Sequence, residues 1–67
     1  MKLTINGSTK EFSAPITTVQ QLLTQLNLSP ERVVVELNRN ILPAEKHPET
    51  ELKSGDSIEL VQFVGGG

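Results

Sequence analysis

Few side chains in this 67-residue sequence have the chemistry of a catalyst. There is no cysteine, which excludes disulfides, thiolate catalysis and most zinc sites. The one histidine, His47, stands between a lysine and a proline in a segment without hydrophobic periodicity, and we expect it to be a solvated loop side chain. The serines have no recognisable base partner in so short a sequence. Side-chain catalysis is therefore not predicted.

Acidic side chains gather in the second half of the sequence. They are Glu45, Glu49, Glu51 and Asp56. Such a group could bind a hard cation, but it lacks the glycine and the ligand spacing of an EF-hand loop. A solvated acidic face is the simpler interpretation, so we predict that this chain itself binds no metal and no cofactor.

The sequence ends on Val64 followed by three glycines, Gly65, Gly66 and Gly67. By composition alone this end could be frayed chain or a remnant of cloning. Residues without a Cβ atom can, however, enter a narrow channel with backbone angles closed to other residues. Four extended residues span about 13 Å, enough to cross the wall of an active site. We therefore expect residues 64–67 to form a flexible tail that threads into a partner enzyme.

The terminal carboxylate of Gly67 is the reactive group of that tail. As an ionised acid it is a poor acyl donor, because attack on it must expel oxide. Joined to AMP it would carry a good leaving group. Gly67 is thus the residue predicted to be modified.

A tail of this kind needs a folded surface that docks. Ordering four residues costs roughly 4–8 kcal/mol, and glycine buries almost no apolar area to offset this cost. If Ile58 and Leu60 point into the core, Val61 and Phe63 point outward from the same strand. We expect Val61 and Phe63 to contact the partner, although Phe63 could instead lie under a loop as a core residue.

The first half of the sequence has two clear periods. Residues 2–13 alternate apolar and polar side chains around Asn-Gly, the strongest short hairpin signal. An apolar stripe at helical spacing follows, with Thr18 as the expected N-cap and Asn27 as the left-handed residue after the helix. Leu28 would then fold back on the helix. We predict a hairpin and a helix of eight to nine residues.

The second half indicates further strands. Val33, Val35 and Leu37 share one face of a strand, and a turn leads into a short irregular β piece. Residues 43–51 show no period, and Leu52 is the only firm core anchor expected in this region. A last strand starts near residue 57. The order predicts an α+β fold, a β-grasp or ubiquitin-like domain over 1–63. It would have a mixed four- to five-stranded sheet, one main helix on one face, and the last strand central beside the first.

The composition limits the classes of partner that this protein is expected to bind. Six Lys and Arg against eight Asp and Glu leave a net charge of -2, and the basic residues are spread singly without Tyr or Trp between them. Nucleic-acid binding is therefore not expected. No segment resembles a signal peptide or a membrane span. We expect a cytoplasmic domain that is monomeric when free.

Several motifs together resemble one family. "RVVVELNRNILP", "LKSGDSIELVQFVGGG", the "TVQQLLTQLNL" helix and the opening hairpin are similar to the ThiS group of sulfur carrier proteins of thiamine biosynthesis. The resemblance covers the whole sequence and implies the β-grasp fold. It also implies that Gly66 and Gly67 are the Gly-Gly end, with Gly67 modified. In this group the carrier is a protein co-substrate and not an enzyme.

The resemblance further implies partners. A ThiF-type enzyme would adenylate Gly67 with ATP and Mg²⁺, and sulfur from a cysteine desulfurase would convert it to a thiocarboxylate. Thiazole synthase (ThiG) would then take that sulfur. Two alternatives stay open: a sulfur carrier of the molybdopterin-synthase type, and a ubiquitin-like modifier or interaction module.

Overall fold

The computed structural model describes residues 1–13 and 16–62. Five strands, one α-helix and two 3₁₀ helices follow one another in this part of the chain. They are β1 (Lys2–Ile5), β2 (Ser8–Glu11), α1 (Val19–Gln25), η1 (Pro30–Arg32), β3 (Val33–Leu37), β4 (Asn40–Leu42), η2 (Ala44–Glu49) and β5 (Ser57–Gln62).

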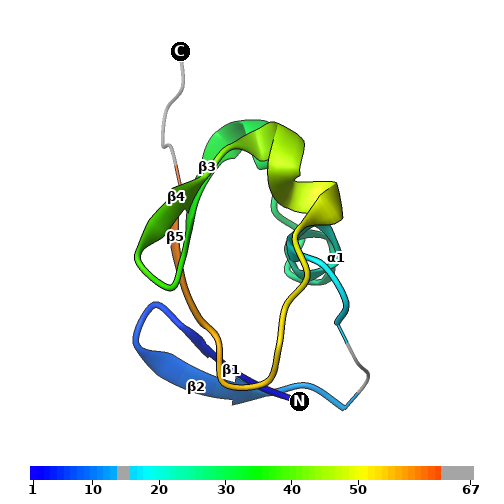
Figure 1. Ribbon diagram of the computed structural model, residues 1–67, viewed down its shortest axis with the longest axis vertical. Coiled ribbons are helices and arrows are strands. Elements are labelled where there is room, and N and C mark those ends of the chain that lie inside the picture. Colours follow the sequence, from blue (N-terminus) through cyan, green and yellow to red (C-terminus); the bar gives the residue numbers. More distant parts are fainter. Residues whose placement is uncertain (14–15, 63–67) are drawn as a thin grey trace.

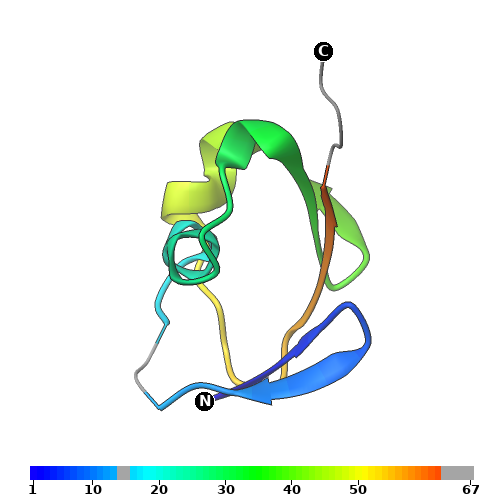
Figure 2. The same cartoon turned by 180° about the vertical axis from the view of Figure 1, so that it is seen from behind.

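The strands form one mixed sheet in the order β2-β1-β5-β3-β4. β1 and β5 run parallel, whereas the other neighbouring pairs are antiparallel. α1 and η2 lie on the same side of this sheet, and its other face carries no helix among the described residues (Figures 1 and 2). The predicted α+β fold is therefore confirmed, with five strands and with β5 at the centre.

Two tight turns shape the edges of the sheet. Asn6 and Gly7 have φ values of 50° and 82°, as a type I′ hairpin turn requires, and β1 pairs with β2 on either side. Asn38 and Arg39 repeat this geometry between β3 and β4, with φ values of 49° and 75°. In both hairpins an asparagine occupies the first turn position.

Helix α1 begins and ends as its sequence indicates. The Thr18 hydroxyl accepts a hydrogen bond from the N–H of Gln21 at 3.2 Å. The Gln21 side chain reaches back, but to the N–H of Thr17 rather than of Thr18 itself. At the other end Asn27 has a φ of 60°, and the N–H of Leu28 donates to the carbonyl of Leu23 at 2.8 Å. These are the bonds of a Schellman motif, so both predicted caps are confirmed, around a helix of seven residues.

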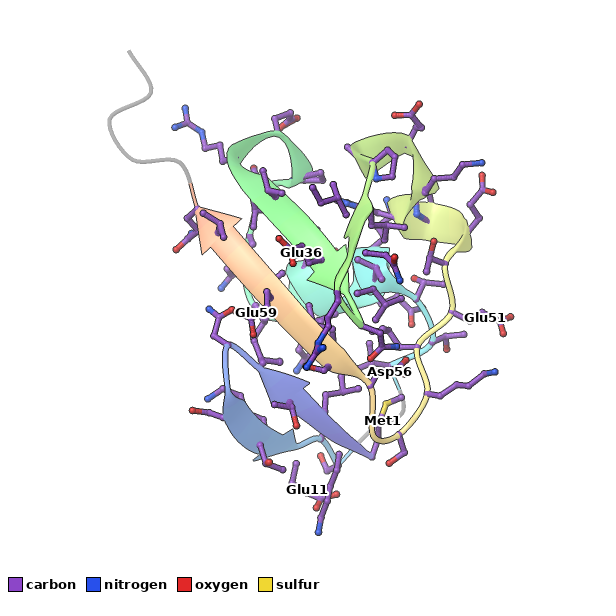
Figure 3. The ribbon with its side chains drawn as sticks, turned by 60° about the vertical axis from the view of Figure 1, so that its left-hand side comes forward. Met1, Glu11, Glu36, Glu51, Asp56 and Glu59 are labelled. Carbon is purple, nitrogen blue, oxygen red and sulfur yellow. The ribbon has the colours of Figure 1, made fainter. Side chains whose placement is uncertain are left out.

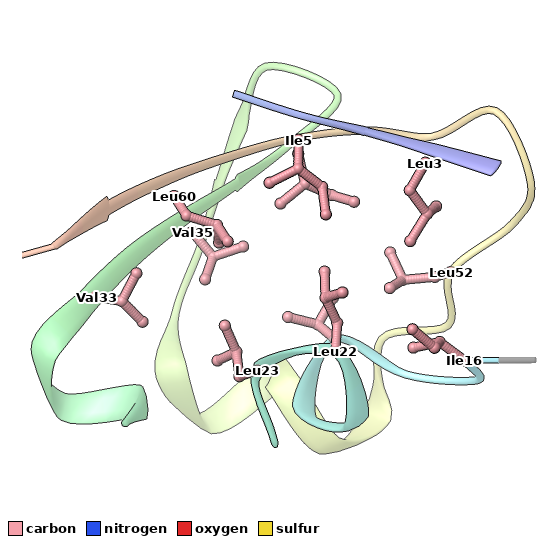
Figure 4. Packing of buried hydrophobic residues seen from close by; sticks show 11 residues of the cluster. Leu3, Ile5, Ile16, Leu22, Leu23, Val33, Val35, Leu52 and Leu60 are labelled. Carbon is pink, nitrogen blue, oxygen red and sulfur yellow. The ribbon is translucent and has the colours of Figure 1, made fainter. Parts of the chain in front are cut away.

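The core lies between the sheet and α1. Side chains from β1, β3 and β5 point toward Leu22 and Leu23 of α1 (Figure 4). Ile58 is fully buried and Leu60 nearly so, which confirms the predicted register of the last strand. Phe12 is half-buried and packs against this cluster.

His47 corrects one expectation from the sequence. It is 2% exposed and lies in η2, which packs against α1. Neither ring nitrogen has a hydrogen-bond partner among the described residues. The prediction of a solvated loop side chain was wrong because residues 44–49 form a 3₁₀ helix whose inward position is filled by the imidazole ring. Leu52 is buried as predicted, but it is not the sole anchor of this region.

Candidate functional site

β5 carries the residues that lead to the predicted tail. It pairs with β3 along most of its length, from Leu37 opposite Ile58 to Val33 opposite Gln62. β1 pairs with it only at its start. Phe63 and residues 64–67 lie outside the described residues, as does the predicted boundary between domain and tail. The described part of the site is therefore the strand and the surface from which these residues follow.

Val61 faces outward, as predicted. Its side chain is 55% exposed, and it lies opposite the half-buried Val34 of β3 on the face that no described helix covers. Ile41 of β4 is on the same face, opposite Glu36, and is 70% exposed. Ile41 and Val61 are the large apolar side chains most exposed in the described part of the chain. Exposed apolar side chains on one face make that face a candidate for a protein contact.

Ile41 and Val34 were not predicted from the sequence as residues of this surface. The signal was present in the alternation of "RVVVELNRNIL", which places Val34 and Glu36 on the face opposite to Val33 and Val35. The β4 segment is only three residues long, however, and its register could not be derived without the turn at Asn38. We call Val34, Ile41, Val61, Glu36 and Glu59 the outer face.

Two carboxylates lie at the centre of the outer face. Glu36 of β3 is directly opposite Glu59 of β5 (Figure 3). The ion pairs of the described residues join Met1 to Glu11 and Lys46 to Glu49, so neither carboxylate of the outer face is paired there. Like charges in directly opposite positions destabilise a sheet. Among residues 1–13 and 16–62, this face therefore combines exposed apolar side chains with two carboxylates that form no ion pair.

The predicted acidic group is divided in the structure. Glu45, Glu49 and Glu51 are exposed, but Asp56 accepts hydrogen bonds from the Lys53 N–H and the Asn38 carboxamide and so belongs to the turn before β5. Within residues 1–13 and 16–62, no three side chains are grouped so that they could hold a metal ion.

A hollow of about 390 Å³ lies along the outer side of α1. Its lining residues are Ile16, Gln20, Gln21, Thr24 and Gln25. None of them carries a charge, and the Thr24 hydroxyl already donates to a helix carbonyl. The hollow offers no group for acid–base or nucleophilic chemistry. Separately, no helix among the described residues is both long and apolar enough to cross a membrane.

The sheet order, the α-helix packed on one face and the central position of β5 define a β-grasp protein, the ubiquitin-like class. A model of the ThiS family matches residues 3–67, and the chain belongs to that family. It is 40% identical to the sulfur carrier protein ThiS of Bacillus subtilis over 65 residues, which are 97% of this chain and 98% of that protein.

Solved structures agree with the family match. The crystal structure of a thiamine biosynthesis protein (ThiS) from Geobacter metallireducens is similar over 100% of both chains, with a TM-score of 0.85 and 38% sequence identity. The recognition of a β-grasp fold from the sequence is thereby confirmed.

Some relatives are much longer. The thiazole synthase of Paramagnetospirillum magneticum is 42% identical over 67 residues, and that of Magnetococcus marinus is 37% identical. This chain spans 20% of the length of each. Sequences similar to this carrier-like domain thus occur within proteins that bear the name thiazole synthase.

Proposed function

We propose that this protein is a sulfur carrier of thiamine biosynthesis, a protein co-substrate and not itself a catalyst. The observation that carries the proposal is the family match from residue 3 to residue 67, which includes the glycine end as well as the folded body. The described part of the chain supports it, because Ile41 and Val61 present exposed apolar side chains on the face of the sheet that no described helix covers.

The chemistry takes place at Gly67. A ThiF-type enzyme with ATP and Mg²⁺ converts the carboxylate to an acyl adenylate and releases pyrophosphate. The terminal sulfur of a persulfide relayed from a cysteine desulfurase then attacks the acyl carbon, and AMP leaves with the electrons of the broken C–O bond. A second thiol of the relay attacks the resulting acyl disulfide, so that the S–S bond breaks, the relay is left as a disulfide and the acyl group keeps the sulfur. The product is a thiocarboxylate, whose sulfur passes to thiazole synthase (ThiG). Val64, Gly65 and Gly66, which precede Gly67 in the sequence, thread into the partner's active site behind it.

We assign the contact with the partner enzyme to the outer face together with Phe63. Ordering a glycine-rich tail is costly and brings little apolar burial, so the affinity must come from the folded body. Val61 and Ile41 provide exposed apolar surface beside the half-buried Val34. Glu36 and Glu59, which form no ion pair with other described residues, favour a partner that brings a basic side chain to the centre of the contact.

Deletion of Gly67 tests the proposal. The wild-type protein and the truncated protein are each incubated with a purified ThiF-type enzyme, ATP and Mg²⁺, and AMP and pyrophosphate are measured. We expect an unchanged unfolding curve and no adenylation after deletion. Normal adenylation of the truncated protein would contradict the assignment of Gly67.

Intact mass spectrometry of the protein from its native cells separates the remaining alternatives. An oxygen-to-sulfur exchange at the C-terminus supports a carrier. Conjugates with lysines of other proteins support a ubiquitin-like modifier, and an unchanged mass supports an inert interaction module. A carrier of the molybdopterin-synthase type is distinguished by supplying the thiocarboxylate to purified thiazole synthase, which should consume it only if the thiazole assignment holds.

A further inference from the structure

The central strand β5 extends beyond its neighbour β1. On the β1 side, the backbone N–H groups of Thr4 and Asn6 donate to the carbonyl oxygens of Asp56 and Ile58 at 3.0 and 2.9 Å. At Asn6 the chain enters the hairpin turn, with a φ of 50°, and then runs into β2. β1 therefore offers no backbone group to Leu60, the next residue of β5 that faces this side.

The carboxamide of Asn6 takes the place of that missing backbone. Its Oδ1 accepts a hydrogen bond from the N–H of Leu60 at 2.7 Å, and its Nδ2 donates to the carbonyl of Leu60 at 3.2 Å. Asparagine meets both demands of the position. It carries a donor and an acceptor on one planar group, and it tolerates the positive φ of the turn.

We propose that Asn6 is a positioning residue for the carrier reaction, an inference that rests on the proposed function of Gly67. Leu60 is two residues before the end of β5 at Gln62. The carboxamide extends the hydrogen bonding on both sides of β5 as far as Leu60. It therefore fixes the end of the strand that precedes residues 63–67, which we call the base of the tail. A fixed base limits the orientations in which the terminal carboxylate reaches the partner, and a small loss of orientation can reduce the rate of a reaction strongly.

Asn38 provides a matched control within the same molecule. It occupies the same position of the other hairpin turn, with a φ of 49°. Its Oδ1 accepts from the N–H of Ser57 at 3.0 Å and its Nδ2 donates to the Asp56 carboxylate at 3.1 Å. Asn38 thus holds the start of β5, whereas Asn6 holds its end. The two residues share type, turn position and bond number, but differ in their distance from the tail.

The experiment compares Asn6→Gly with Asn38→Gly. Glycine keeps the turn geometry, and each variant loses the two hydrogen bonds of its carboxamide. The measurements are the unfolding free energy, hydrogen exchange at the Leu60 amide, and kcat and KM for the carrier with a purified ThiF-type enzyme, ATP and Mg²⁺. We expect kcat to be about tenfold lower in Asn6→Gly than in Asn38→Gly, with similar KM values, since the outer face is unchanged. The Leu60 amide should exchange faster only in Asn6→Gly.

The outcomes distinguish the positioning role of Asn6 from the proposed carrier function of Gly67. Equal kcat values in the two variants, with the wild-type protein adenylated normally, overturn the role of Asn6 alone. Absence of adenylation in the wild-type protein overturns the proposed function itself. Should Asn6→Gly fail to fold, Asn6→Asp keeps the acceptor but places a second oxygen toward the Leu60 carbonyl. An unchanged kcat in Asn6→Asp would also overturn the role of Asn6.

Discussion

Glu36 of β3 lies directly opposite Glu59 of β5 on the outer face of the sheet, and neither forms an ion pair within the described part of the chain. Such a pair lowers stability, yet it is placed between exposed apolar side chains at the centre of the candidate docking face. On the proposed docking mode, we expect this cost in the free protein to be relieved when a partner brings a positive charge to the pair.

The variant Glu36→Gln should therefore change stability and docking in opposite directions. Removing one charge should raise the free energy of unfolding by about 0.5 kcal/mol. It should also raise the KM for the carrier about threefold at low salt, because a partly exposed charge contact contributes about 0.5–1 kcal/mol, with less effect at high salt. Urea unfolding and adenylation kinetics measure the two effects. Glu51→Gln is the control, since it removes the same charge from an exposed site away from this face (Figure 3). An unchanged KM in Glu36→Gln would remove the acidic pair from the interface.

Ile41 and Ile58 offer a second matched comparison. Ile41 is 70% exposed and Ile58 is fully buried. Ile41→Ala should change stability by less than about 0.5 kcal/mol but raise the KM for the carrier about five- to tenfold, because it removes apolar surface from the docking face. Ile58→Ala should instead cost about 2–5 kcal/mol of stability by leaving a cavity. Thermal unfolding and adenylation kinetics distinguish them, and a normal KM in Ile41→Ala would argue against docking through β4.

We expect a substitution of His47 by an apolar residue to stabilise the protein. Both of its ring nitrogens are buried without a hydrogen-bond partner among the described residues, and a buried polar group without a partner is unfavourable. His47→Leu, which has a similar volume, should raise the free energy of unfolding by about 1 kcal/mol and leave adenylation unchanged. Denaturant unfolding at neutral pH is the measurement. A clear loss of stability would mean that the imidazole has a partner in solution.

Substitutions at Asn27 test whether the left-handed residue after α1 contributes to stability. Its φ of 60° is favourable for glycine and tolerable for asparagine, but it strains other side chains. Asn27→Ala should cost about 1 kcal/mol of stability, whereas Asn27→Gly should be close to neutral. Helix content by circular dichroism, followed through a urea titration, measures both. Equal stability of the two variants would show that the residue leaves the left-handed region in solution.

Local signals allowed much of the fold to be predicted from the sequence. Asn6-Gly7 determines a hairpin by backbone angles that few other residue pairs adopt, and the cap residues of α1 form bonds within a few positions of one another. The alternation of Ile58 and Leu60 with outward residues gave the correct register of β5. Each of these features depends on neighbours in the sequence.

The features that were missed depend on distant contacts. Residues 44–49 contain no apolar period, and only the packing of η2 against α1 makes the position of His47 an interior one. Ile41 became a candidate docking residue only when β4 was placed beside β3. The carboxamide bonds of Asn6 to Leu60 join residues 54 positions apart, and nothing in the turn motif itself indicates them.

The parallel pairing of β1 with β5 joins the first strand to the last one. During synthesis, β1, β2, α1, β3 and β4 are all translated before the strand that belongs between them, so the sheet stays open until residues 57–62 have left the ribosome. A chain whose synthesis stops before β5 lacks the central strand of the sheet. Its core side chains are then exposed to proteases. Completion of the fold thus coincides with delivery of β5, the strand that precedes residues 63–67. Proteolysis of chains that lack β5 would then also remove chains that lack the proposed carrier end.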